Sequence, residues 1–325
     1  MLSRRTLLLG AAAARPAFFH KGVNFTAEQP DRYASDAAVR LMLSLRDYGV
    51  NSVAFVPYGF TPRNQPVVRF DGSRVWERDD DLTRMAEIAH RNGLRVFLKP
   101  QLWVGGGWPG DLEFPREADR EAWFRSYRPY LEHYSRLAAV IQADVFCVGC
   151  EFTKLSRNAA AWRSLIALAR RNYAGPLTYA ATQGVEFESV EFWDALDYIG
   201  LNNYYPLPDT LDVSASAAKV EAVQRRFGKP VIFPEAGFSS MENAHREPWA
   251  ENSRRVSMEA QTRGYEAVCR AFFGKPWFHG VYWWKIGSNG AGGLQDRSHT
   301  PWRKPAMEVI RRYYSVARSA PSKRG

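Results

Sequence analysis

Short apolar runs recur along the chain, and between them apolar residues repeat every three or four positions, as on one face of a helix. In the stretch 35–48, for example, Ala38, Leu41 and Leu45 fall on one face. The apolar runs predict strands at Lys21–Phe25, Ser52–Tyr58, Arg95–Pro100, Val145–Cys150, Leu177–Ala181, Tyr198–Leu201, Val231–Glu235 and Phe278–Trp284. The periodic stretches predict helices at 35–48, 79–92, 119–141, 158–172, 190–195, 214–227, 252–273 and 305–316.

This alternation of strands and helices indicates the fold class. Strands that are apolar almost throughout and that alternate with amphipathic helices form parallel sheets covered by helices. Eight such units in 325 residues predict a single (β/α)8 barrel, a TIM barrel. A doubly wound open sheet is the runner-up, but TAEQP follows the first predicted strand where such folds carry a G-x-G-x-x-G turn.

The loops differ in length at the two ends of the predicted barrel. Helix-to-strand turns are mostly short, whereas the strand-to-helix loops are long, at 59–78, 101–118, 202–213, 236–251 and 286–304. TIM barrels build their sites from strand-to-helix loops, so we expect the site at the carboxyl ends of the strands. We assign the barrel to residues 18–317, with an export signal at 1–17 before it and a disordered tail at 318–325 after it.

The first residues have the pattern of a targeting segment. Arg4 and Arg5 precede a short leucine run, and small residues suited to cleavage follow up to Ala14. The arginine pair resembles a twin-arginine signal, so we expect export to the periplasm or the extracellular space, with the twin-arginine pathway as the candidate route. Neither this run nor any later one is long enough for a membrane span.

Charge and cysteine content exclude several function classes. The formal net charge is +10, but the basic residues form no single stripe, and many lie as Arg pairs late in predicted helices, where they complement the helix dipole. Nucleic-acid binding is therefore a weak hypothesis. Cys147 and Cys150 lie within one predicted strand, and Cys269 is the remaining cysteine, so neither a disulfide framework nor a zinc site is expected.

Two glutamates stand at the carboxyl ends of predicted strands. Glu151 directly follows the fourth strand, and Glu235 ends the seventh. In an eight-stranded barrel these positions are three strands apart, so both carboxyl groups can point across one mouth. A pair of carboxyl groups that flank one site is what glycoside hydrolysis requires, with one group protonated and the other ionised. Either glutamate alone would read equally well as a surface acid at the start of a loop.

At this point the sequence resembles the clan A glycoside hydrolases, and most of all glycoside hydrolase family 113, the β-mannanase family. The residues that carry the resemblance are KGVNF at 21–25, LKPQLWV at 98–104, VGCEF at 148–152, YIGLNNYYP at 198–206, FPEAGF at 233–238, GVYWWK at 280–285 and KPA at 304–306. The resemblance implies a retaining enzyme for β-1,4-mannan or related β-mannosides. In it Glu151 is the acid/base and Glu235 the nucleophile, and no metal or organic cofactor is needed.

The sequence departs from the family pattern at two positions. Cys150 stands where many clan members have an asparagine, which leaves the partner of the sugar's 2-hydroxyl unassigned. Gln101 stands where the family would place a histidine after Lys-Pro.

Supporting residues follow from the alternation of side chains along strands. Asn202 and Tyr204 share one face, and Tyr204 can reach Glu235 to donate a hydrogen bond, although it can equally be a tyrosine packed under the loop. Lys99 can contact a sugar hydroxyl or a carboxylate, or form a structural salt bridge.

Aromatic residues are the remaining candidates for sugar contact. Trp283 and Trp284 are adjacent and face opposite ways, and the resemblance favours Trp284 as the platform for a sugar ring. Trp103 and Trp108 lie in the glycine-rich segment WVGGGWPG, where they can form a sugar-stacking lip or simply pack the loop.

Two rival functions stay open. One is a hydrolase of β-glucan or another hexoside with the same machinery, and the other is a catalytically silent barrel that binds polysaccharide on the same aromatic residues. A binder has no need of both glutamates. In each reading the partner is an oligo- or polysaccharide.

Overall fold

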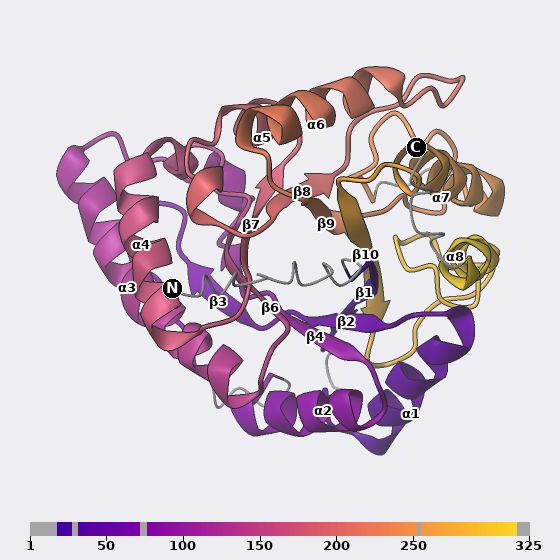
Figure 1. Ribbon diagram of the computed structural model, residues 1–325, viewed down its shortest axis with the longest axis horizontal. Coiled ribbons are helices and arrows are strands. Elements are labelled where there is room, and N and C mark those ends of the chain that lie inside the picture. Colours follow the sequence, from indigo (N-terminus) through magenta and orange to yellow (C-terminus); the bar gives the residue numbers. More distant parts are fainter. Residues whose placement is uncertain (1–17, 28–31, 72–76, 252–254, 317–325) are drawn as a thin grey trace, which may run out of the picture.

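The computed structural model of the chain describes residues 18–27, 32–71, 77–251 and 255–316. The export signal predicted at 1–17 and the tail predicted at 318–325 lie outside the described residues. Eight parallel strands close into a barrel in the order β1-β10-β9-β8-β7-β6-β4-β2 (Figure 1), which confirms the predicted TIM barrel. The barrel strands are β1 His20–Thr26, β2 Ser52–Phe55, β4 Arg95–Leu98, β6 Val145–Cys150, β7 Leu177–Thr182, β8 Ile199–Asn203, β9 Val231–Ala236 and β10 Phe278–Gly287.

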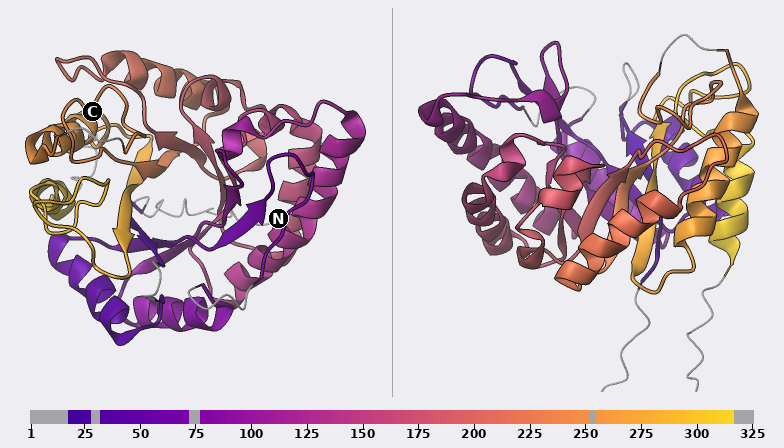
Figure 2. Two further views of the ribbon diagram at one scale, coloured as in Figure 1. Left: turned by 180° about the vertical axis from the view of Figure 1, so that it is seen from behind. Right: turned by 90° about the horizontal axis from the view of Figure 1, so that it is seen from above.

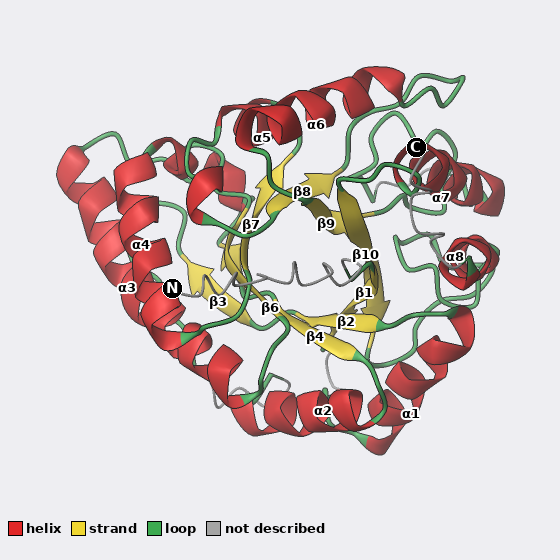
Figure 3. Ribbon diagram, viewed as in Figure 1, coloured by secondary structure: helices red, strands yellow, loops and turns green. Residues whose placement is uncertain are grey.

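Helices surround the barrel on all sides (Figure 3). They are α1 Asp36–Ser44, α2 Asp79–Arg91, α3 Glu117–Val140, α4 Ala159–Asn172, α5 Val185–Ser189, α6 Ser214–Phe227, α7 Met258–Phe272 and α8 Ala306–Ser315. Short 3₁₀ helices lie at Leu45–Tyr48, Pro109–Asp111, Leu155–Arg157 and Trp193–Ala195. The helix predicted at 190–195 is wrong, because the chain there forms only the last of these 3₁₀ turns and the α-helix of that unit lies earlier, at α5.

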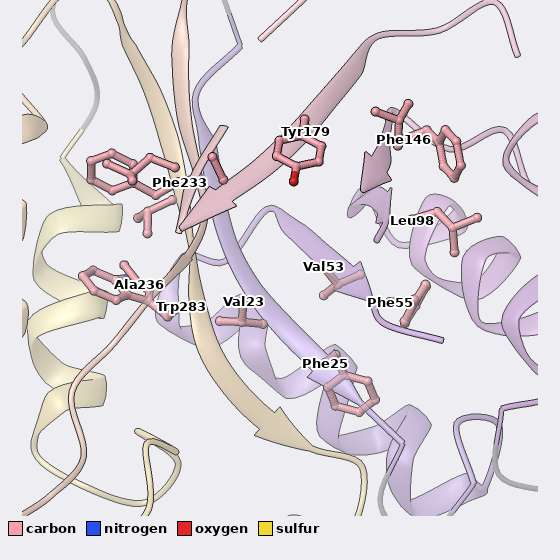
Figure 4. Packing of buried hydrophobic residues seen from close by; sticks show 14 of the residues in the cluster. Val23, Phe25, Val53, Phe55, Leu98, Phe146, Tyr179, Phe233, Ala236 and Trp283 are labelled. Carbon is pink, nitrogen blue, oxygen red and sulfur yellow. The ribbon is translucent and has the colours of Figure 1, made fainter. Parts of the chain in front are cut away.

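The core has two layers because side chains alternate along each strand. Residues that point outward, such as Val23, Val53 and Phe233, pack between the barrel and its helices (Figure 4). Residues that point inward form a smaller cluster that includes Ala54, Phe97 and Tyr282. The barrel interior is therefore a filled core, and any site must lie at one of its ends.

Two of the barrel strands continue beyond the barrel. β3 (Tyr58–Thr61) and β5 (Gln101–Val104) form a separate two-stranded parallel sheet that follows β2 and β4 in the chain. Tyr58 pairs with Gln101, as Ser52 pairs with Arg95, so both sheets keep one register. The sequence predicted one uninterrupted strand at Ser52–Tyr58 and one at Arg95–Pro100. The first prediction runs across the gap between β2 and β3 and is wrong there, whereas the second ends two residues after β4, and β5 was not predicted.

The ends of the barrel differ, as the loop lengths predicted. The long loops gather at one end, which is the upper end in the right panel of Figure 2. At the other end, the ammonium group of Lys21 donates to the backbone carbonyl of Tyr314, and the Tyr314 hydroxyl donates to the carbonyl of Gly22 (2.9 Å). Strand β1 and the end of α8 therefore meet at the face opposite the loops. In the described part of the chain, no helix is long and apolar enough to span a membrane.

Candidate active site

A cavity of about 620 Å³ opens among the loops at the carboxyl ends of the strands. Both sequence-predicted glutamates face it, Glu151 at the end of β6 and Glu235 at the end of β9. The other residues that line it are Gln101, Leu102, Trp108, Pro109, Cys150, Thr182, Gln183, Tyr204, Trp249, Trp284 and His299. The barrel thus brings together residues that are far apart in the sequence, and it does so at the end predicted from the loop lengths.

Glu235 is nearly enclosed, with 5% of its surface exposed, and three donors surround its carboxylate. Lys99 and Gln101, the residues on either side of Pro100, both donate to Oε1. Tyr204 donates to Oε2 at 3.0 Å, the contact that strand alternation predicted. Lys99 is itself fully buried, so its ammonium group forms an ion pair with Glu235 inside the protein. These contacts hold the carboxyl group of Glu235 in one orientation at the cavity.

Glu151 has different neighbours and a different protonation equilibrium. Asn202 donates to its Oε1 at 2.9 Å, and the indole of Trp108 donates to its Oε2 at 2.6 Å. Burial, and then the charge of Glu235, raise the pKa of Glu151 from 4.5 to about 7, against the opposing effect of those two hydrogen bonds. Glu151 can therefore hold a proton near neutral pH, which a general acid requires.

The backbone at Glu151 lies in the left-handed region, at φ 59°, which is unfavourable for a residue with a side chain.

A buried carboxyl group, Glu186 on α5, holds the residues that follow Glu151 in place. Its Oε1 accepts from the Tyr179 hydroxyl at 2.5 Å, and the oxygen of that hydroxyl accepts from the backbone N–H of Phe152 at 2.9 Å. Its Oε2 accepts from the Thr153 hydroxyl at 3.2 Å. Sequence reasoning missed Glu186 because it lies within a short helix that was predicted elsewhere.

The two departures from the family pattern both lie beside Glu235. The Cys150 thiol is 3.9 Å from its Oε1, and the Gln101 amide donates to the Cys150 sulfur at 3.3 Å. The amide of Asn202 also approaches that sulfur, at 3.5 Å. Burial raises the pKa of Cys150, so the thiol is neutral and cannot replace a carboxylate in this site.

The family model of Glycoside Hydrolase Family 113 matches residues 23–299. The chain belongs to glycoside hydrolase family 113. It is therefore a glycoside hydrolase, and its substrate is a carbohydrate. The resemblance predicted from seven short segments is confirmed, because the match extends through most of the barrel.

Solved structures agree with this family 113 assignment. The chain is similar to the GH113 β-mannanase AaManA from Alicyclobacillus acidocaldarius in complex with ManMIm, with 32% identity and a TM-score of 0.85 over 92% of this chain and 97% of that one. It is also similar to a complex of a GH113 β-1,4-mannanase, with 26% identity and a TM-score of 0.84 over 91% of this chain and 99% of that one. A β-glucuronidase from Faecalibacterium prausnitzii, 16% identical, shares the fold at a TM-score of 0.61. Comparison with curated protein sequences gave no match.

The tryptophans of this family 113 enzyme divide between core and cavity. Trp283 is fully buried and stacks on Tyr265, with 4.1 Å between ring centroids. Trp284 points the other way into the cavity, and the ammonium group of Lys99 lies 4.8 Å from its ring centroid. The two adjacent indoles thus face opposite ways, as the strand alternation predicted.

The glycine-rich loop carries two indoles, and only one of them lines the cavity. Trp108 lines the cavity and contacts Glu151, whereas Trp103, which was predicted to bind substrate, does not line it. The Trp103 side chain is 61% exposed and makes an edge contact with the ring of Tyr58 at 5.3 Å. Strand β5 explains the difference, because it carries Trp103 out along the small second sheet while the chain turns back at Trp108 toward the barrel axis.

Trp249 and His299 are among the cavity residues that were not predicted. Both come from long loops, Trp249 from the loop after β9 and His299 from the loop after β10. The sequence offered one signal for them, since long strand-to-helix loops carry the variable part of a barrel site. No strand periodicity extends into these loops to tell which side chains point inward.

Proposed function

We propose that this glycoside hydrolase is a retaining, β-mannanase-like enzyme that acts on β-1,4-mannan or related β-mannosides. The observation that carries the proposal is the unequal pair of glutamates, Glu235 among three donors and Glu151 with a pKa raised to about 7. The β-mannanases that the chain resembles over more than nine-tenths of its length support the choice of sugar.

In the first step Glu235 attacks the anomeric carbon while Glu151 gives its proton to the departing glycosidic oxygen. The bond from the anomeric carbon to that oxygen breaks, and a covalent glycosyl-enzyme ester forms at Glu235. In the second step the ionised Glu151 takes a proton from a water molecule, the water oxygen attacks the anomeric carbon, and the ester bond to Glu235 breaks. Two inversions give net retention, and both glutamates return to their starting protonation states.

The neighbours suit these two roles. Lys99, Gln101 and Tyr204 hold the Glu235 carboxylate in one orientation and stabilise its charge both before attack and when it leaves the ester. Trp284 offers the face of its indole beside the same carboxylate, where a pyranose ring can stack. Asn202 and Trp108 orient Glu151 toward the cavity.

Substitution of each glutamate tests the assignment of roles. Glu235→Ala should abolish turnover on every substrate, because no glycosyl-enzyme can form. Glu151→Ala should fail on mannan but keep part of its first step on an aryl β-mannoside whose leaving group needs no proton. Added azide should then accelerate its second step and yield a β-mannosyl azide, because azide needs no general base.

Three results would contradict the assignment. An α-mannosyl azide from Glu235→Ala, with no azide effect on Glu151→Ala, would reverse the two roles. A loss of less than about tenfold in both variants, roughly 1.4 kcal/mol of barrier, would exclude the two-glutamate mechanism. Proton NMR that showed an α anomer as the first product of a β-linked substrate would exclude retention.

The choice of sugar is tested separately with unmodified enzyme. Reducing ends should appear fastest from β-1,4-mannan in a panel with β-glucan and xylan. Faster release from β-glucan would favour the rival hexoside hydrolase. Binding to mannan with no release from any polymer would favour the silent polysaccharide-binding barrel.

A further inference from the structure

Cys150 lies between the two glutamates, on the cavity wall at the end of β6. Two donors approach its sulfur, the side-chain amide nitrogens of Gln101 at 3.3 Å and of Asn202 at 3.5 Å. Contacts to sulfur are longer than contacts to oxygen because the sulfur atom is larger. Both amides come from other strands, Gln101 from β5 and Asn202 from β8. The thiol therefore joins β5, β6 and β8 at the cavity.

Each of these amides also donates to one glutamate. Gln101 donates to Oε1 of Glu235, and Asn202 donates to Oε1 of Glu151 at 2.9 Å. A primary amide nitrogen carries two hydrogens, so one N–H can point at a carboxyl oxygen while the other points at the sulfur. The contacts thus form one path from Glu235 through Gln101, Cys150 and Asn202 to Glu151. The sulfur is the atom at which the two halves of this path meet.

The orientation of each amide decides which of its atoms the glutamate meets. The nitrogen donates to a carboxylate, whereas the carbonyl oxygen of a flipped amide would repel it. The Asn202 side chain is fully buried, and its Oδ1 has no hydrogen-bond partner within the described residues. In that part of the chain, Glu151 and the Cys150 sulfur are therefore the contacts that keep the Asn202 nitrogen turned toward the acid/base.

We propose that Cys150 is a positioning residue for both glutamates: its sulfur accepts from the second N–H of Gln101 and of Asn202, and so keeps both amide nitrogens turned toward Glu235 and Glu151. The inference rests on the proposed function, because it assigns a further residue to the same two-glutamate reaction. It accounts for the contact between the two departures from the family pattern, since Gln101 and Cys150 supply the two partners of one N–H···S bond. The sulfur acts as an acceptor and takes no part in bond making.

Cys150→Ala is the first test. Loss of the acceptor should lower kcat on the β-1,4-mannan oligosaccharide mannohexaose by about tenfold, or about 1.4 kcal/mol of barrier, the size of one lost neutral hydrogen bond. KM should stay within about twofold, because the sulfur acts on the glutamates rather than on the bound sugar. Cys150→Ser keeps an acceptor, but a C–O bond is shorter than a C–S bond. Its kcat should therefore lie between those of Cys150→Ala and the unmodified enzyme.

Cys147→Ala is the matched control. Cys147 is a buried cysteine on the same strand, but its thiol donates to the carbonyl of Gly149 at 3.1 Å and does not line the cavity. Both alanine variants leave a small void, so their melting temperatures should fall by similar amounts. Cys147→Ala should nevertheless keep the kcat of the unmodified enzyme. Equal losses of kcat in the two variants would mean that Cys150 serves packing alone, and would overturn the inference.

The pH profile separates positioning from packing. Burial, and then the charge of Glu235, raise the pKa of Glu151, and the bond from Asn202 is one of the contacts that oppose this rise. A loosely held amide opposes it less, so the pH above which kcat/KM on mannohexaose falls should move up by about half a unit in Cys150→Ala. The substitution leaves in place the charged and titratable groups that face Glu151, which are Glu235 on β9, Lys99 after β4, Glu186 on α5 and Tyr204 after β8.

The same substitution in an Asn202→Ala background tests the route of the effect. The sulfur reaches Glu151 through Asn202, so Cys150→Ala should no longer move the pH profile there. A shift of the same size in both backgrounds would overturn the inference, and so would an unchanged kcat in Cys150→Ala. A loss of kcat that disappears on a 2-deoxy-mannoside would also overturn it, because the thiol would then act on the sugar's 2-hydroxyl.

Failure of the proposed function gives a different result. An unmodified enzyme that releases reducing ends from β-glucan but not from mannan would overturn the proposed sugar alone, and the same variants would then be measured on a β-glucan oligosaccharide. Losses below about tenfold in both Glu151→Ala and Glu235→Ala would remove the two-glutamate mechanism and this inference with it.

Discussion

At the scale of single residues, Glu151 combines a strained backbone with a raised pKa. Its left-handed φ turns the carboxyl group back over the end of β6 and into the cavity, where burial disfavours the charged form. A residue in that region costs of order 1–3 kcal/mol, which the surrounding structure must offset. The cost is located where the chemistry needs a proton donor at neutral pH.

The raised pKa makes the first prediction. Glu151 must hold its proton for the first step, and with a pKa of about 7 it loses that proton as the pH rises through 7. On mannan, kcat/KM should therefore fall above a pH of about 7, and an unshifted carboxyl group would already have lost activity above about 4.5. This fall in activity, the alkaline limb of the pH profile, reports the coupled pair of glutamates rather than one of them alone.

An aryl β-mannoside with a good leaving group is the control for the pH profile. Its first step needs no proton from Glu151, so the alkaline limb should weaken or vanish. A limb near pH 7 that is identical for both substrates would assign it to another group.

The second prediction concerns the stability and activity of a Glu186 variant. Glu186→Ala leaves the Tyr179 hydroxyl, the Thr153 hydroxyl and the Thr182 N–H without their acceptor inside the protein. Unsatisfied buried donors cost about 1–3 kcal/mol each, so the free energy of unfolding in urea should fall by roughly 3 kcal/mol. Since these groups brace the residues after Glu151, kcat on mannan should fall more than kcat on the aryl β-mannoside.

Glu188→Ala is the matched control on the same helix. Its exposed carboxylate accepts from Lys219 at the surface and from the part-buried Tyr205 hydroxyl, so its loss should cost about 1 kcal/mol. If Glu186→Ala lost stability but kept the unmodified ratio of kcat on the two substrates, Glu186 would be structural only.

At the scale of elements, the sequence predicted which segments are strands but not where two of them are interrupted. Pro57 and Pro100 lie between β2 and β3 and between β4 and β5, at equivalent places in the shared register. Proline has no N–H to donate, so the ladder stops there and resumes beyond it. In the sequence the apolar run continues across Pro57, and periodicity alone could not detect the gap.

The candidate site was predictable only as far as the strands reach. Glu151, Glu235, Asn202 and Tyr204 lie on strands or directly after them, so alternation could place them. Trp103 does not line the cavity, and loop composition could not tell which of the two nearby indoles turns inward. His299 bonds to the carbonyl of Pro248, the residue before Trp249, and no local pattern in either loop specifies that contact.

The third prediction concerns stability and follows from the close packing between strands β7 and β8. A Cβ at Gly200 on β8 would lie 2.2 Å from the Tyr179 carbonyl oxygen and 2.6 Å from the Thr178 hydroxyl oxygen. The carbonyl belongs to the neighbouring strand β7 and cannot move without breaking the barrel ladder. Gly200→Ala should therefore lower the free energy of unfolding by about 3 kcal/mol, the upper end of the usual cost of overpacking, because the clash is with backbone.

Gly274→Ala is the control for this substitution, because no atom lies within 4 Å of its would-be Cβ. Its free energy of unfolding should stay within about 0.5 kcal/mol of the unmodified protein. Equal melting temperatures for the two variants would show that the barrel can yield at β8.

At the scale of the whole molecule, the cavity and the contacts that join β1 to α8 lie at opposite ends of the barrel. The cavity lies among the long loops, while β1 and the end of α8 meet at the opposite face through Lys21, Gly22 and Tyr314 (Figure 2). The barrel itself closes through the parallel pairing of β1 with β10, and these contacts fasten α8 to β1 at that face.

That geometry decides how the enzyme would behave when tethered. A bead, a fibre or a second protein joined near residue 18 or residue 316 would sit behind the barrel, and the cleft would face outward into the medium. Immobilised in this way, the enzyme should still work on polymers too large to enter a pore. Attachment through a loop around the cavity would instead turn the cleft toward the support.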